Sequence, residues 1–289
     1  MSKNNFFLFS IMIIAMISWG VSWPAAKIVG QYSSPEYLIA WRFLFGLISM
    51  IFVMGFLKIP ISFPGKALKY VLSASVLIIF YNYNYLKGTQ VGISGLGGVI
   101  VPTISPIITF VLSAIFFKNK FKKKGFYGLL LGLCGSGILT RAWDMNVNAI
   151  VGSGSVYFFL GAVSWAFITI LTKKSSNTLN PINFSFWVYS FGFIFALVFF
   201  PMESSSNIFS LELRFWINFI LISSIALGLG TTAYFYTTMR LGPSKASSFM
   251  FIVPFSSILS SSIIIGEPVL ISTIFGGFIT IFAVYLVNN

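Results

Sequence analysis

Apolar residues occur along this chain in long runs that short polar or charged breaks separate. Runs of about 18 to 25 apolar residues have the length that an α-helix needs to cross a bilayer. The pattern therefore predicts an all-α integral membrane protein with ten transmembrane helices, whose ends are placed to within a few residues. The predicted spans are 6–28, 36–57, 67–86, 93–117, 125–141, 152–172, 182–201, 214–238, 244–265 and 269–287.

Many anchor residues of the first half recur in the second half at a nearly constant distance. Those of the first two spans return 146 positions later, and those of the fourth and fifth spans return 148 positions later. The first set is Ser18, Trp19, Lys27, Pro35, Trp41, Phe45 and Gly46, repeated as Ser164, Trp165, Lys173, Pro181, Trp187, Phe191 and Gly192. The second set is Pro106, Ser113, Ile115 and Gly128, repeated as Pro254, Ser261, Ile263 and Gly276.

This repetition predicts two homologous units, residues 1–146 and residues 147–289, with five spans each. An odd number of spans in each unit makes the two units antiparallel in the membrane. Inverted repeats of this kind occur in secondary transporters, whose substrate site lies where the repeats meet. The first apolar run follows Lys3 like the start of a signal peptide. Because its residues match an internal helix, we interpret it as an uncleaved first span.

Composition supports a membrane protein, since 57% of the residues are hydrophobic and only 8% are charged. So few charges could not cover the surface of a soluble domain of this length. With both termini in the cytoplasm, thirteen of the 18 basic residues fall on the cytoplasmic side and all five acids fall on the outer side. That bias is typical of a multi-pass protein of the cell (inner) membrane with both termini in the cytoplasm.

The net charge of +13 belongs mostly to the cytoplasmic loops, among which the basic run at 118–124 is the densest. A nucleic-acid or acidic-lipid site is the alternative for that run, but its place between two spans favours a topology anchor. The predicted partners are therefore membrane lipids and a small-molecule substrate, with no nucleic acid.

The chain resembles the drug/metabolite transporter superfamily, in particular its EamA-type permeases with two five-helix repeats. The order and spacing of several short motifs carry this resemblance. They are Ser18-Trp19-Gly20 with Lys27, Trp41-Arg42-Phe43, Ser105-Pro106, Gly128, Ser164-Trp165, Val253-Pro254, Gly266-Glu267-Pro268 and Gly276. The resemblance implies ten helices, two alternating states and export or exchange of small metabolites such as amino acids. Lys118-Asn119 departs from the family, which usually has a Gly-Glu pair at the end of helix four.

Polar and aromatic groups within the spans are the candidates for a substrate cavity, because lipid offers them no hydrogen bonds. Trp19 and Trp23 share one face of the first helix, and Trp165 matches Trp19 in the second half. Arg42 is the one charge well inside a span, and it either binds a substrate carboxylate or phosphate or reaches the outer surface as an anchor. The remaining candidates are Tyr81, Asn82, Thr231 and Tyr234. Ordinary packing is the alternative for the tryptophans, and an interfacial belt is the alternative for the neighbouring Tyr83 and Tyr85.

A second group of residues is predicted to shape the helices. Prolines free backbone carbonyls and kink helices, and glycines permit close helix contact. These residues are Pro24, Pro106, Gly128, Pro254 and Gly276. The pattern leaves open whether the glycine contact is internal or joins two copies in a homodimer.

The chain has no histidine, one cysteine and no acidic residue in the interior of a span. An enzyme needs acid–base groups or metal ligands near the reacting atoms, so this inventory argues against an enzyme, a metal site or a cofactor. It also removes the usual intramembrane proton carriers. The sequence therefore predicts a secondary transporter of a small organic metabolite, and the alternatives are a small-solute channel and, far behind, a membrane-embedded transferase.

Overall fold

A computed structural model describes residues 3–92, 94–118, 123–144, 154–200, 207–265 and 269–288, and all regular structure in these ranges is helical. Helices lie at all ten predicted segments. Eight of these segments hold a single α-helix. They are α1 (Lys3–Val29), α2 (Pro35–Phe56), α3 (Leu68–Val91), α4 (Ser94–Phe117), α5 (Lys123–Leu139), α7 (Ser155–Ser175), α8 (Pro181–Phe199) and α13 (Ile271–Asn288).

The eighth and ninth segments are each built from three joined helical pieces. The eighth comprises α9 (Leu213–Ile220), the π-helix η4 (Leu221–Thr231) and α10 (Thr232–Leu241). The ninth comprises α11 (Pro243–Ser248), the 3₁₀ turn η5 (Phe249–Ile252) and α12 (Val253–Ile265). Three further 3₁₀ turns lie in the connections: η1 (Gly65–Ala67), η2 (Ala142–Asp144) and η3 (Ile208–Ser210).

Within the described residues, eight helical stretches are long and apolar enough to cross a membrane. The two predicted spans outside this set are α3 and α5. α3 carries the polar stretch Tyr81 to Tyr85 and continues past Lys87 to Val91, five residues beyond its predicted end. α5 has only 17 residues. The structure thus supports a multi-pass, all-helical membrane protein.

Two corresponding helices, α2 and α8, begin in the same way. Ser34 accepts a hydrogen bond from the Tyr37 backbone N–H, and Asn180 accepts one from the Asn183 N–H. Each cap is followed by a proline, which at the first position of a helix loses no hydrogen bond. In both helices, the capping side chain and the proline after it determine where the first turn begins.

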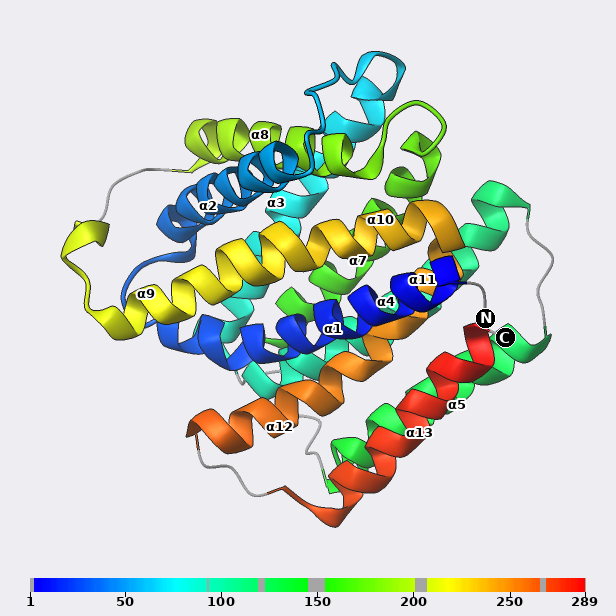
Figure 1. Ribbon diagram of the computed structural model, residues 1–289. Helices are drawn as coiled ribbons and strands as arrows, with labels where there is room; N and C mark the ends of the chain where they lie inside the picture. The colour runs from blue at the N-terminus through cyan, green and yellow to red at the C-terminus, as the bar shows by residue number, and fades with distance from the viewer. Residues whose placement is uncertain are drawn as a thin grey trace.

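The described chain begins and ends at the same end of the bundle (Figure 1). Phe9, near the start of α1, packs against Phe249 with ring centroids 5.0 Å apart. Asn288, at the end of α13, donates from Nδ2 to the Ser248 hydroxyl at 2.9 Å. Both ends of the chain therefore meet the α11–η5 segment.

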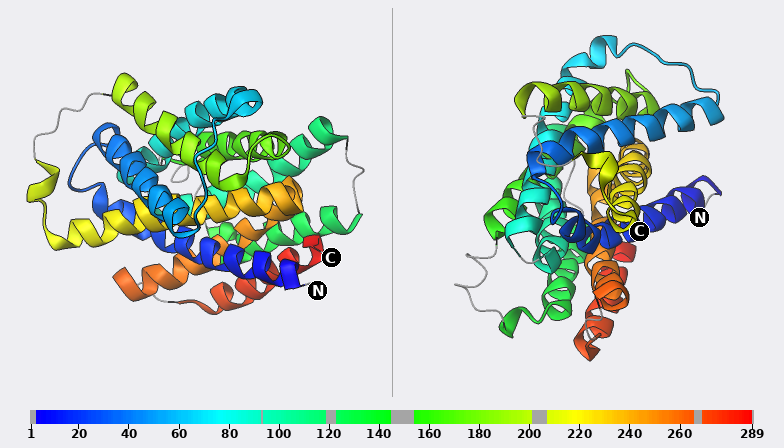
Figure 2. Two further views of the ribbon diagram at one scale, coloured as in Figure 1. Left: turned by 45° about the horizontal axis from the view of Figure 1, so that its top comes forward. Right: turned by 90° about the vertical axis from the view of Figure 1, so that its left-hand side faces the viewer.

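The helices pack mainly as pairs that join the two halves of the sequence. α2 lies along α8, α3 along α7, and α1 along η4 and α12 (Figure 1). α5 and α13 lie side by side at one edge, as both views in Figure 2 also show. The two halves are intertwined rather than separate lobes.

Glycines allow α5 and α13 to touch. A Cβ atom on Gly276 would lie 2.6 Å from the Leu139 nitrogen and 2.7 Å from the Gly135 oxygen. One on Gly128 would lie 2.5 Å from Val287 Cγ2 and 3.2 Å from the Ala283 oxygen. The glycine contact is therefore made within one chain.

The prolines expected to shape the helices are all buried. Pro24 lies inside α1 and Pro106 inside α4, which also contains Pro102. Pro254 is the second residue of α12, which follows the 3₁₀ turn η5. The Gly266-Glu267-Pro268 motif and Asn119 of the Lys118-Asn119 departure lie outside the described residues.

The π-helix in the middle of the eighth segment is a feature that hydrophobic periodicity did not predict. Its carbonyl groups accept bonds from side chains of three other helices. Arg42 Nε donates to Ile222 O at 3.2 Å, Trp19 Nε1 to Ala226 O at 3.1 Å, and Tyr189 Oη to Leu227 O at 2.8 Å. π-Helical turns are rare and occur often at functional sites.

Candidate functional site

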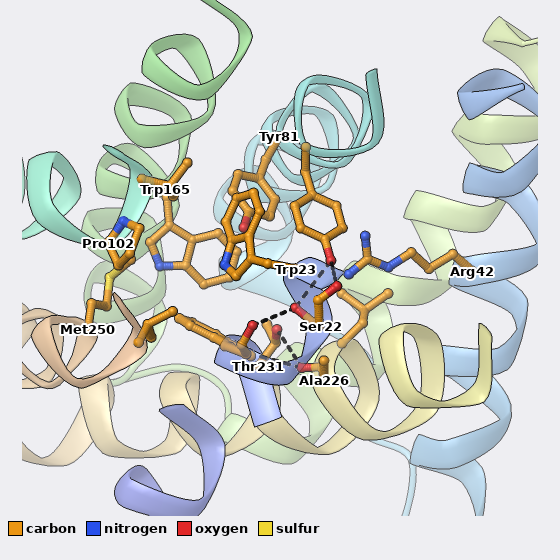
Figure 3. Close-up of a pocket in the computed structure, with 14 residues that line it drawn as sticks. Ser22, Trp23, Arg42, Tyr81, Pro102, Trp165, Ala226, Thr231 and Met250 are labelled. Atoms are coloured by element: carbon orange, nitrogen blue, oxygen red, sulfur yellow. Dashed lines mark hydrogen bonds between the residues drawn. The ribbon is translucent and has the colours of Figure 1, made fainter. Parts of the chain in front are cut away.

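A small pocket of about 20 Å³, which has room for about one water molecule, lies in the middle of the bundle, between α1, α2, α3, α4, α7, η4, η5 and α12 (Figure 3). Both halves of the sequence contribute to its lining. The lining residues are Trp19, Ser22, Trp23, Arg42, Tyr81, Tyr85, Val101, Pro102, Trp165, Ala226, Leu227, Thr231, Met250 and Val253.

Three pairs of sequence-equivalent residues contribute to the lining of this pocket. Trp19 and Trp165 are equivalent at the offset of 146, and Pro102 and Met250 at the offset of 148. Tyr81 and Thr231 are equivalent when Gly92 is aligned with Gly242, and they also line the pocket. The pocket therefore lies where corresponding parts of the two halves come together.

Aromatic rings form one side of the pocket. The Trp19 and Trp165 rings meet edge to face, with centroids 4.9 Å apart and planes at 90°. Tyr81 lies 4.7 Å from Trp165, and Trp23 packs at 4.7 Å against Tyr85. Contacts of this geometry stabilise ring pairs beyond the area that they bury. They hold a rigid apolar wall in place.

Polar groups gather at another side of the pocket, and the first half supplies the hydroxyl and guanidinium groups there. Tyr85 Oη donates to the Ser22 carbonyl at 2.6 Å. Ser22 Oγ in turn donates to the Trp19 carbonyl at 2.7 Å. The Arg42 guanidinium reaches from α2 toward Ser22 (Figure 3), and its Cζ lies 4.6 Å from the centroid of the Tyr85 ring. Arg42 is only 4% exposed, so it does not extend to the surface as an anchor.

The structure brings together six of the eight predicted cavity residues. These six are Trp19, Trp23, Arg42, Tyr81, Trp165 and Thr231. Tyr234 lies behind the lining, where its ring contacts Trp19 and Trp165 and its hydroxyl is 2.9 Å from Thr169 Oγ1.

Asn82, also predicted for the cavity, is not part of the lining of this pocket. Its side chain is fully buried, and Nδ2 donates to the Ile78 carbonyl one turn earlier at 2.6 Å. Successive residues of a helix point about 100° apart. Because Tyr81 faces the pocket, its neighbour Asn82 faces another helix and satisfies its donor within α3.

The sequence carried signals for some of the lining residues that were not predicted. Tyr85 lies four positions after Tyr81, hence on the same face of α3. Met250 is the equivalent of Pro102, so identifying either one as a lining residue points to the other. No comparable signal exists for Ala226 and Leu227, because their exposure to the pocket depends on the π-helix.

The two equivalent lysines of α1 and α7 cap equivalent helix ends. Lys27 Nζ donates to the carbonyl of Gly92, at the end of α3, at 2.8 Å. Lys173 Nζ donates to the carbonyl of Met239, near the end of α10, at 2.7 Å. Cations at helix C-termini satisfy carbonyl groups that lack partners inside the helix.

A further polar contact joins the loop after α1 to the start of α9. Tyr32 Oη donates to the Glu212 carboxylate. This hydrogen bond raises the pKa of the Tyr32 phenol above its ordinary value, because ionisation would place two negative charges side by side. The contact joins the loop at the end of α1 to the start of the eighth segment, whose π-helix η4 lines the pocket.

No cluster of three or more potential metal ligands occurs among the residues that the structure describes. The chemistry of the pocket is that of one guanidinium, hydroxyl groups, aromatic rings and backbone carbonyls. Such groups bind and orient a ligand.

Comparison with known proteins finds transporters whose similarity extends over nearly the whole chain. The model of the EamA-like transporter family matches residues 7–141 and again residues 152–289. An uncharacterized transporter of Bacillus subtilis (strain 168), YvbV, is 27% identical over 96% of this chain and 90% of its own length. A WAT1-related chloroplastic protein of Arabidopsis thaliana is 24% identical over 99% of this chain and 70% of its own length. One crystal structure has the same fold, with a TM-score of 0.74, 14% sequence identity and 97% of each chain covered. This chain belongs to the EamA-like transporter family.

Proposed function

We propose that the protein is a secondary transporter that moves a small organic metabolite across the cytoplasmic membrane by alternating access. The proposed substrate is an amino acid or a related compound, and the proposed direction is export. The observation that carries the proposal is the pocket lined by equivalent residues of the two halves, above all Trp19 and Trp165. A site on the axis between inverted repeats can open to either side when the halves exchange conformations.

The contact between α5 and α13 supports the inverted arrangement. Gly128 of α5 meets Val287 of α13, and Gly276, the equivalent of Gly128, meets Leu139, the equivalent of Val287. The second contact is the first one with each residue replaced by its equivalent in the other half. Reciprocal contacts of this kind occur around a two-fold axis. Phe43 and its equivalent Tyr189 also touch, with ring centroids 6.5 Å apart.

The proposed topology has ten spans, including α3 and α5, with both termini in the cytoplasm. In a background without Cys134, we expect a membrane-impermeant maleimide to label Val91→Cys and Trp143→Cys in intact cells. Lys58→Cys and Lys118→Cys are expected to react only after the membrane is opened. Positions 58 and 91 bracket α3, and positions 118 and 143 bracket α5. If both positions of a pair are labelled in intact cells, the helix between them does not cross the membrane.

Transport itself is tested in proteoliposomes with a panel of labelled amino acids and related carboxylates. We expect uptake that saturates and is accelerated by unlabelled substrate on the opposite side, because an alternating-access site carries one ligand at a time. An imposed pH gradient is expected to leave the rate unchanged, since the spans hold no interior carboxylate or histidine. Flux that rises linearly with concentration and shows no counterflow indicates a channel instead.

A further inference from the structure

The pocket carries an unbalanced positive charge. Among the residues that the structure describes, Arg42 is the only buried charged side chain. The only ion pair in the same part of the chain joins Arg141 to Asp144 at 2.6 Å, and both of these side chains are half exposed. A guanidinium keeps its charge at any physiological pH. The interior of the bundle therefore holds a cation without a protein carboxylate to balance it.

The guanidinium also has unused hydrogen-bonding capacity. Its Nε–H donates to the Ile222 carbonyl at 3.2 Å, its Cζ lies 4.6 Å from the centroid of the Tyr85 ring, and the Tyr85 hydroxyl also interacts with it. Nη1 is buried and has no hydrogen-bond partner. A buried charged donor without a partner is costly, and each such group in a native structure calls for an explanation. A ligand in the pocket would supply the missing acceptor.

The fold itself does not require this charge. The position equivalent to Arg42 in the second half is Val188, which is fully buried in α8. Ser22 and Tyr85 likewise have no equivalents in the lining of the pocket. The side chains of Arg42, Ser22 and Tyr85 thus come from the first half alone, whereas Trp19 and Trp165 of the aromatic wall are equivalent residues of the two halves.

We infer that the pocket binds an organic monoanion with a planar acidic group, such as a carboxylate, and a flat apolar body. The acidic group pairs with Arg42, whose fork of N–H donors matches the two oxygens of a carboxylate. The body would lie against Trp19, Tyr81 and Trp165, whose rings favour stacking. Because the pocket as it stands has only about 20 Å³ of free space, these rings must move apart to admit it. This inference rests on the proposed function for the role of the pocket. Among amino acids and related compounds, it favours those with a net negative charge over neutral amino acids, which are zwitterions, and over cations.

The test uses four compounds with one phenyl ring and different charges: 3-phenylpropionate, 3-phenylpropionamide, 3-phenylpropylamine and L-phenylalanine. Calorimetric titration of the purified full-length protein in detergent measures their binding without any need for transport. We expect 3-phenylpropionate to bind at least about tenfold more tightly than the amide, because a hydrogen-bonded charge pair is worth about 1.5 to 3 kcal/mol. The amine is expected not to bind.

The Arg42→Gln variant is expected to remove the preference for the acid over the amide, and Arg42→Lys is expected to retain only part of it. Arg141→Gln is the matched control, since this arginine is exposed and remote from the lining. If the variants at Arg42 do not fold, the binding of the four compounds to the unmodified protein still tests the inference. Equal binding of acid and amide, or preferred binding of the amine or the zwitterion, overturns the inference.

The binding and transport experiments together distinguish failure of this inference from failure of the proposed function. Binding of 3-phenylpropionate that depends on Arg42, without saturable counterflow of it or of any panel compound, supports the anion site and refutes the transporter. Counterflow of a neutral or cationic compound that Arg42→Gln leaves unchanged supports the transporter and refutes the anion site.

Discussion

Replacing Gly276 with alanine is expected to destabilise the protein strongly by forcing α13 away from α5. The added Cβ would lie 2.6 Å from the Leu139 nitrogen and 2.7 Å from the Gly135 oxygen, which is far inside van der Waals contact. Both of these atoms belong to the backbone, so no side-chain rotation can relieve the clash. Overpacking of a well-packed site costs about 1 to 3 kcal/mol, and we expect a value at or above the upper end.

The control for this prediction is Gly55→Ala in α2. A Cβ there meets no atom within 4 Å, and the residue is helical with an ordinary backbone conformation. Alanine is also the better helix former, by about 1 kcal/mol in water. Thermal unfolding of the two variants in the same detergent compares them directly. If Gly276→Ala unfolds at the same temperature as the unmodified protein, the close contact of α5 and α13 is wrong.

Removing the Trp19 side chain is expected to abolish most of the transport activity. Trp19 contacts Trp165 and Tyr234, with ring centroids 4.9 and 5.2 Å away, and anchors its Nε1 on the Ala226 carbonyl of the π-helix. Central aromatic residues of binding sites contribute 2 kcal/mol or more, which corresponds to a loss of about 30-fold. We expect at least that loss in the initial rate of uptake by Trp19→Ala.

Two further variants separate binding from folding. Trp143→Ala removes the same side chain from the turn η2, where Trp143 is 63% exposed, and is expected to transport normally. Trp19→Phe keeps a ring but loses the hydrogen bond to Ala226, so an intermediate rate is expected. A rate for Trp19→Ala close to that of Trp143→Ala, at equal amounts of folded protein, would remove Trp19 from the site.

The repeat in the sequence explains why much of the site was predictable. Trp19 and Trp165 stood out because two large side chains occupied equivalent positions, and residues near a two-fold axis meet their own equivalents. Tyr81 stood out because polar groups within a span need a partner. These arguments use only spacing and chemistry, which a sequence contains.

The parts that could not be predicted depend on details of helix geometry. The position of Asn82 outside the pocket lining could not be predicted, because a polar side chain can donate to a carbonyl of its own helix, here that of Ile78. The length of α3 was underestimated because Lys87 to Gln90 remain helical although they are polar or small. The π-helix was missed because hydrophobic periodicity does not distinguish five-residue from four-residue hydrogen bonding.

The short helix α5 has a consequence for the lipids around it. Its 17 residues span about 25 Å at 1.5 Å per residue, and the charges of Lys124 and Arg141 limit its apolar part at both ends. The hydrocarbon core of a typical bilayer is about 30 Å thick. In the proposed topology with ten spans, α5 and α13 form one edge of the bundle, and the bilayer beside that edge is expected to be locally thinned, a case of hydrophobic mismatch.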